Sequence, residues 1–256
     1  IVASWSEDAS TPSDLLPATR RTASRVRASL GETLSTIRAS EAVLEKVTTP
    51  SLRALQLYSQ ADAAMRRGGL RDAAQSLLRQ AIAEDPTFAS AHLLLAWTIH
   101  NQGEAAARLS GPEPHVNEEL VAHVTRARDL AAQTSDVERL FILGSYHDML
   151  SGSSYRTVMS AEDTAHLRQA VSAYEALMRI KPDHYWAVNN LSQVYMVLEL
   201  ESEATKWLLR TSDVRSLEPG FAFQAAMQLL RLGDVSRARP YMERRRSLTT
   251  PEMERP

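Results

Sequence analysis

The residues best suited to acid–base or metal chemistry in this chain are its seven histidines, because the 256 residues include no cysteine. His92 and His100 are too far apart on one expected helix for a two-ligand clamp, and no HExxH spacing occurs. His123, His147 and His166 come from different expected hairpins. A three-histidine site assembled across hairpins stays open, and the alternative is that these are surface or groove histidines.

Other catalytic patterns are weak. Glu118 and Glu119 are adjacent, so they point to different faces of a helix and favour solvated side chains over an acid–base pair. No glycine-rich phosphate loop followed by a lysine occurs, and no strained nucleophile turn marks any serine. We therefore expect a protein that is not an enzyme, with no catalytic residue, no metal ligand and no cofactor.

Composition and charge indicate helices and disfavour charged polymers as partners. Apolar residues make up 44% of the chain, aromatic residues only 6%, and alanine and leucine dominate. The net charge of −2 gives no general attraction to nucleic acid or to anionic membranes. No run of 18 apolar residues occurs, which predicts no membrane insertion by this part of the chain.

The chain opens with Ile1 and not with methionine, and it lacks a signal-peptide pattern. We expect a soluble fragment of a longer protein. Its location and its oligomeric state stay open.

Residues 52–86 form the segment around which the rest is organised. They predict two short helices separated by Gly68-Gly69, since glycine takes the left-handed closing conformation without a steric penalty. Thr49 and Pro50 suit the start of the first helix, and Pro86 marks the stop of the second. The apolar stripes are Leu55, Tyr58, Ala61 and Met65 in the first half and Ala74, Leu78 and Ala81 in the second.

The same pattern returns four more times downstream. In the second copy, Asn101-Gln102-Gly103 is expected to end the first helix, and an insertion at 104–119 delays its partner. In the third copy, an insertion at 151–164 separates the helices. In the fifth, Pro240 is expected to kink or delay the second helix.

The order aromatic, small, large, glycine turn, alanine, large, alanine and proline over about 34 residues resembles the tetratricopeptide repeat. Asp62 stands where that family usually has a small residue. The resemblance implies an all-α fold, an α-solenoid of about five hairpins over residues 47–248 with insertions at 104–119 and 151–164. Residues 249–256 are expected to be a disordered tail.

The first 46 residues predict a short strand at 1–5 and a helix that starts at Thr11-Pro12-Ser13-Asp14. The segments 26–34 and 44–52 are similar to large, membrane-anchored bacterial receptors with a cytoplasmic serine/threonine kinase or winged-helix domain. This resemblance implies that residues 1–46 are the β–α remnant of an upstream α/β segment. It also implies a sensory or scaffolding region and leaves open whether that region is extracytoplasmic or cytoplasmic.

In stacked hairpins of this kind, the first helix of each pair lines a concave surface. Aromatic side chains there would act as apolar anchors, and amides would pair with the backbone of an extended peptide. The alternative for Trp97 and Trp186 is that they fill gaps between repeats. The candidate peptide-binding residues are Trp97, His100, Asn101, Phe141, Trp186, Asn189 and Gln193, and further residues expected on this surface are Ser90, Leu93, Glu138, Ser145 and Asp148.

The sequence therefore predicts a non-catalytic interaction module that binds an extended peptide or a partner domain in its concave groove. One alternative is a small-ligand sensor whose inserted loops close over the groove. Another is a hydrolase assembled from the histidines.

Overall fold

The computed structural model of the chain is helical in every regular element that it describes. The residues described are 6–11, 14–29, 49–66, 71–110, 117–152 and 159–249. The chain forms two compact units, residues 1–142 and 143–256, with the boundary inside α7. None of the described helices is long and apolar enough to cross a membrane.

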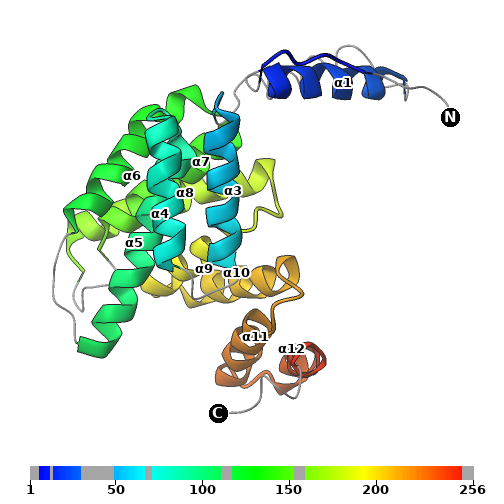
Figure 1. Ribbon diagram of the computed structural model, residues 1–256. Coiled ribbons are helices and arrows are strands. Elements are labelled where there is room, and N and C mark those ends of the chain that lie inside the picture. Colours follow the sequence, from blue (N-terminus) through cyan, green and yellow to red (C-terminus); the bar gives the residue numbers. More distant parts are fainter. Residues whose placement is uncertain are drawn as a thin grey trace. The chain divides into compact units, whose positions relative to one another are not determined.

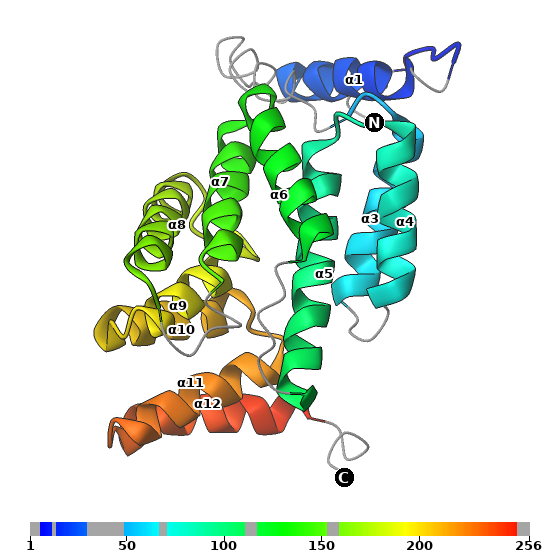
Figure 2. The ribbon, with the colours of Figure 1, turned by 90° about the vertical axis from the view of Figure 1, so that its left-hand side faces the viewer.

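In the first unit, helices α3 to α6 lie side by side in chain order. Helix α3 packs on α4, α4 packs on α5, and α5 packs on α6 (Figures 1 and 2). The helices are α1 (Leu15–Ser29), α3 (Leu52–Arg66), α4 (Arg71–Glu84), α5 (Ala89–Ser110), α6 (Glu118–Leu130), the short 3-10 helix η2 (Ala131–Gln133) and the start of α7 (Asp136–Leu150).

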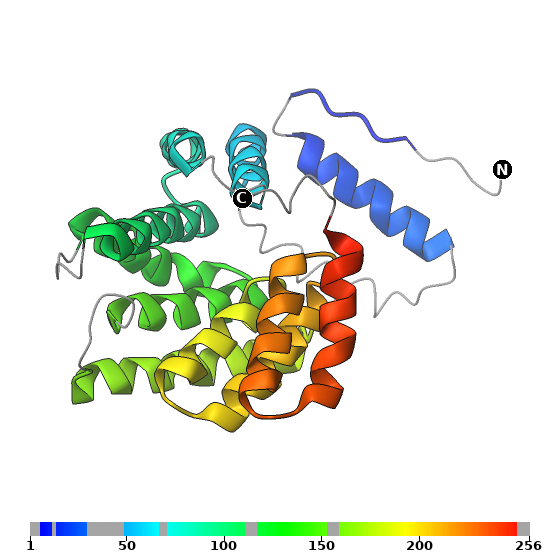
Figure 3. The same ribbon diagram turned by 90° about the horizontal axis from the view of Figure 1, so that it is seen from below.

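Within the second unit, too, each helix packs on the next along the chain. Helix α8 packs on α9, α9 on α10, α10 on α11 and α11 on α12, and the last two lie side by side (Figure 3). After the end of α7, the helices are α8 (Ala161–Ile180), α9 (Ala187–Val197), α10 (Glu201–Val214), α11 (Pro219–Arg231) and α12 (Val235–Leu248). The all-α prediction is confirmed for the described residues.

Several helices begin at residues whose side chains satisfy one of the first amides. Ser51 accepts from the amide of Ala54 in the first turn of α3. Thr49 donates its hydroxyl to Asp85 at 2.5 Å and accepts from the amide of Ser51, just before the helix begins. Ser160 and Asp163 form a reciprocal capping box at α8. Between α11 and α12, Gly233 takes a φ of 78°, which a side chain would disfavour.

The core depends on small residues at helix contacts, as the sequence predicted. Ala61, Ala74 and Ala81 are all 0% exposed, so the backbones of α3 and α4 approach closely. The buried face of α3 is rotated relative to the prediction: Ala54 and Leu57 are buried beside Ala61, whereas the predicted Leu55, Tyr58 and Met65 are half-buried.

The tightest contact of the second unit joins α7 to α8. A Cβ atom added to Gly144 would lie 2.5 Å from the ring of Tyr174, which is itself 0% exposed. The Tyr174 hydroxyl is 3.2 Å from Ser145 Oγ and accepts from the side-chain amide of Asn190 on α9 at 3.2 Å. A buried phenol hydroxyl without partners would be costly, and here its partners come from two other positions in the core. The network therefore joins α7, α8 and α9.

Several predicted boundaries are corrected. Helix α5 does not end at Gly103 but continues to Ser110, because the strong helix formers that follow outweigh one glycine. Residues 161–164 of the second insertion form the first turn of α8, and Pro240 does not delay α12, which begins at Val235.

Other expectations lie outside the described residues. They concern the strand at 1–5, the Gly68-Gly69 turn, residues 111–116 and 153–158 of the two insertions, the tail beyond Thr249 and most of the receptor-like segments. Within the N-terminal region, helix α1 is present, and the carboxylate of Asp14 accepts from both the amide and the hydroxyl of Thr11.

Candidate functional site

In the first unit, three candidate residues follow one another on α5. Trp97 and Asn101 are half-buried, but His100 is only 7% exposed. The Trp97 and His100 rings meet edge to face, with centroids 5.3 Å apart. Phe141 on α7 is half-buried. The burial of His100 disfavours it as a contact residue, whereas the other three keep exposed surface.

Other residues expected on this surface are already engaged or covered. The hydroxyl of Ser90 on α5 donates to the carboxylate of Glu138 on α7, which ties these two helices together. Leu93 is 3% exposed and Ser145 is 0% exposed, so both belong to the core. More of the positions expected on the concave surface are therefore used for packing between helices than the sequence predicted.

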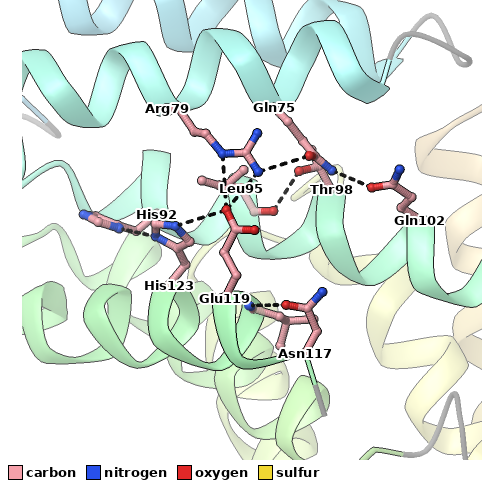
Figure 4. Close-up of polar contacts among 10 residues, drawn as sticks. Gln75, Arg79, His92, Leu95, Thr98, Gln102, Asn117, Glu119 and His123 are labelled. Atoms are coloured by element: carbon pink, nitrogen blue, oxygen red, sulfur yellow. Dashed lines mark hydrogen bonds and ion pairs between the residues drawn. The ribbon is translucent and has the colours of Figure 1, made fainter. Parts of the chain in front are cut away.

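A cluster of polar side chains joins α4, α5 and α6 in the first unit (Figure 4). Arg79 on α4 donates to the carboxylate of Glu119 on α6 at 2.8 Å. Gln75 on α4 donates to Gln102 on α5 at 2.9 Å. These contacts hold the start of α6 and the middle of α5 against α4, so the cluster links neighbouring helices.

Two pairs of histidines each connect one helix to the next along the chain, α5 to α6 and α7 to α8. The Nδ1 atoms of His92 and His123 are 2.8 Å apart, and those of His147 and His166 are 2.9 Å apart. The Nε2 of His92 is 3.2 Å from the carbonyl oxygen of Pro86, which can only accept, so this nitrogen carries the proton. Nδ1 of neutral His92 then accepts from His123.

The environment of the first pair favours its neutral form. Burial is the main cause that lowers the pKa of both His92 and His123, and Glu119, 3.9 Å from Nε2 of His123, acts in the opposite direction. No group of three metal-ligating side chains occurs among the described residues. Each pair is accounted for by one hydrogen bond between two helices.

In the second unit, Trp186 lies in a cluster built on Arg215. The Arg215 guanidinium lies 4.1 Å from the ring centroid of Tyr185, 5.2 Å from that of Trp186 and 4.0 Å from that of Phe221. It also donates to both carboxylate oxygens of Glu218, at 2.8 and 2.9 Å. Because Arg215 is only 8% exposed, this cluster favours a packing role for Trp186.

The other two candidates of this unit lie on the exposed side of α9. Asn189 is half-buried, and Gln193, one turn later, is exposed. Gln193 lines a cavity of about 530 Å³ between α9 and α11, which we call the α9–α11 groove. Its apolar lining consists of Met196, Leu208, Phe223, Met227 and Leu230. An amide at the edge of an apolar surface matches the predicted groove chemistry.

The α11 side of this groove was missed by the sequence analysis. Phe223 is 38% exposed, Met227 47% and Leu230 39%, although all three are large and apolar. They recur at intervals of four and three residues, which puts them on one helical face. The signal was present in the sequence: α11 is apolar nearly all round, so its buried alanines cannot account for every apolar position.

A second cavity of about 470 Å³ lies beside α10 and α12 and contains none of the candidate residues. Its lining includes Trp207, Arg210 and Tyr241. The indole nitrogen of Trp207 is buried and has no hydrogen-bond partner among the described residues, so it is not presented to a ligand in the cavity. Neither cavity is lined by a described residue of the two insertions.

Comparison with known proteins supports the fold. No protein-family profile matches the chain, and no curated protein does. Among solved structures, TTC0263, a thermophilic TPR protein of Thermus thermophilus, is similar with a TM-score of 0.56 and 17% identity, over 78% of this chain and 94% of that one. Residues 41 to the end of MamA from Desulfovibrio magneticus RS-1 align with a TM-score of 0.43 and 13% identity, over 77% and 96%. The likeness to TTC0263 shows a tetratricopeptide-like fold.

Proposed function

We propose that this chain is a non-catalytic protein-interaction module that binds an extended peptide or a partner domain along the exposed faces of its first-in-pair helices. The α9–α11 groove is the observation that supports this most strongly. It combines exposed apolar side chains with the amides of Gln193 and Gln224, whereas the amide of Gln228 is already bonded to Thr205 and Arg231. Amides both donate and accept, so they suit the backbone of an extended segment, and methionines adapt to varied side chains.

The helix pairs α3–α4, α5–α6, α7–α8, α9–α10 and α11–α12 would be five tetratricopeptide-like hairpins in this proposal. The resemblance of segments 26–34 and 44–52 to bacterial receptors supports a wider setting, a sensory or scaffolding region of a membrane-anchored protein. In the second unit, the proposed contact residues are Asn189 and Gln193, with Met196, Phe223, Met227 and Leu230 added by the structure. In the first unit, Trp97, Asn101 and Phe141 stay proposed contact residues.

The test is to place a charge inside the groove and a matched charge outside it. Met227→Glu puts a carboxylate in the groove, at a side chain that is 47% exposed, so the fold is expected to tolerate it. Ile180→Glu is the control, because Ile180 is 55% exposed and lines neither cavity. Proteins retained from a lysate of the source cell are quantified by mass spectrometry, and circular dichroism checks the helicity of both variants.

The expected result is a partner that wild type and Ile180→Glu retain and that Met227→Glu loses. The reason is that the carboxylate replaces apolar surface that the partner would cover and must be partly desolvated when the partner binds. Equal retention by all three folded proteins would contradict the proposed groove.

A further inference from the structure

The last helix pair is strongly basic within a chain whose net charge is −2. Residues 219–248, which cover α11 and α12, contain six arginines and only two carboxylates, Asp234 and Glu243. A concentration of one sign of charge on one helix pair raises the local potential and attracts ligands of the opposite sign. The question is which of these arginines are available to a partner.

Three of the six arginines are used within the fold. Arg231 pairs with Glu201 on α10, and Arg244 lies 3.3 Å from Asp213. Arg237 lies 3.4 Å from its helix-capping Asp234. By contrast, the side chains of Arg239, Arg245 and Arg246 are exposed and form no hydrogen bond or ion pair with a described residue.

Arg245 lies at the edge of the α9–α11 groove. Its guanidinium carbon is 4.5 Å from the ring centroid of Phe223, and Phe223 lines the groove. None of the described residues that line this groove is acidic, and the single charged one is Arg231. An apolar surface thus meets a cation that has no carboxylate partner among the described residues. Beside apolar surface, such a cation interacts with an anion more strongly than it would in open water.

We propose that the α9–α11 groove takes a segment of a partner protein that carries apolar side chains next to glutamates or aspartates. The apolar side chains fill the groove, and a carboxylate pairs with Arg245, while Arg239 and Arg246 add longer-range attraction. This rests on the proposed function, because it names the kind of partner that the same groove selects. Charge complementarity carries it: no described acid lines the groove, Glu201 at its edge is already paired with Arg231, and the cation of Arg245 has no carboxylate partner among the described residues.

The experiment selects peptides without assuming their sequence. A phage-displayed library of random 12-residue peptides is selected in parallel on wild type, on Met227→Glu and on Arg245→Gln. We expect peptides selected on wild type to be enriched in both apolar and acidic residues relative to the unselected library. Selection on Arg245→Gln should keep the apolar enrichment and lose most of the acidic enrichment.

A synthetic peptide from this selection then measures the contact directly by fluorescence anisotropy. Arg245→Gln should weaken its binding about tenfold, because a charge-assisted pair beside apolar surface is lost. Arg239→Gln, on the same helix, is the matched control and should weaken it less than about threefold, as expected for a screened, longer-range charge. A glutamate-to-glutamine peptide should bind wild type and Arg245→Gln equally, since the pair is already broken.

The outcomes separate this inference from the proposed function. Peptides selected on wild type and lost on Met227→Glu, but without acidic enrichment, would overturn the inference and leave the interaction module standing. No selection above the Met227→Glu background would overturn both. Strong binding of wild type to vesicles of phosphatidylserine, lost in Arg245→Gln and with no peptide selected, would replace the acidic segment by an anionic lipid surface.

Discussion

Both units pair polar side chains across helices, but the second unit also leaves a large apolar surface open. In the first unit, polar side chains pair with one another across helices, as Arg79 does with Glu119 and His92 with His123. In the second unit, apolar side chains such as Phe223 stay exposed beside an arginine without a described carboxylate partner. Groups that already satisfy one another gain little from a new partner, whereas exposed apolar groups gain from burial. The contrast locates the proposed recognition surface in the second unit.

The largest expected effect tests whether the second unit combines this open surface with a tight interior. Gly144→Ala should destabilise the protein by about 1–3 kcal/mol, because its Cβ would lie 2.5 Å from the Tyr174 ring. Gly144→Leu should cost more. The control is Gly220→Ala, where a Cβ meets nothing within 4 Å. Urea unfolding of both variants provides the measurement, and equal midpoints would show that α7 and α8 are not in close contact.

The next effect in size is a loss of folding stability in acid. Each unit contains buried histidines whose pKa is lowered. Burial, helped by Lys181, lowers the pKa of His184 to about 4 from its ordinary value of 6.5. The unfolded chain therefore binds this proton first, so stability is complete above pH 6.5 and is lost as the pH falls toward 4. Between about pH 7 and about pH 5 the loss is about 2 kcal/mol from this group.

The matched variant is His184→Asn. Nδ1 of His184 accepts from the amide of Ala187 at the start of α9, and an asparagine oxygen can take over that role without titrating. Hydrogen exchange read by mass spectrometry should show that α9 opens less with falling pH in the variant than in wild type. An unchanged pH profile of α9 would assign the acid sensitivity to other groups.

The smallest effect tests the polar cluster of the first unit. Arg79→Gln should lower stability by at most about 1 kcal/mol, because both partners of the Arg79–Glu119 pair are about half exposed and water screens the pair. Thermal unfolding at low and high salt gives the measurement. A loss well above this would mean that the cluster is a main support of the unit, and the contrast between the units would then be weaker.

Much of the fold could be predicted from residue types and spacing. The buried face of α4 was predicted correctly: Ala74, Leu78 and Ala81 are all 0% exposed. Such positions can be predicted because helical periodicity places apolar residues on one side. The end of α5 could not be predicted in this way. Gly103 favours a stop, the helix formers after it favour continuation, and the outcome depends on the sum of these propensities.

The candidate site was harder to predict because inward-facing positions on a helical repeat can serve packing or recognition. His100 is buried and Ser90 bonds to Glu138, although the periodicity placed all three on the concave surface. Phe223 and Met227, by contrast, look like core residues in the sequence and stay exposed in the structure. A pattern reports the face of a helix but not the neighbour that covers it.

By itself, the sequence determined the class of the protein: apolar periodicity, small residues at helix contacts and proline and glycine stops specify stacked helical pairs, because these are local properties of the chain. The tertiary structure alone decided which faces are closed. The pairing of His92 with His123, the arginine beside Phe223 and the groove between α9 and α11 all join residues from different helices. Whether a side chain is buried or open depends on such neighbours, which only packing brings together.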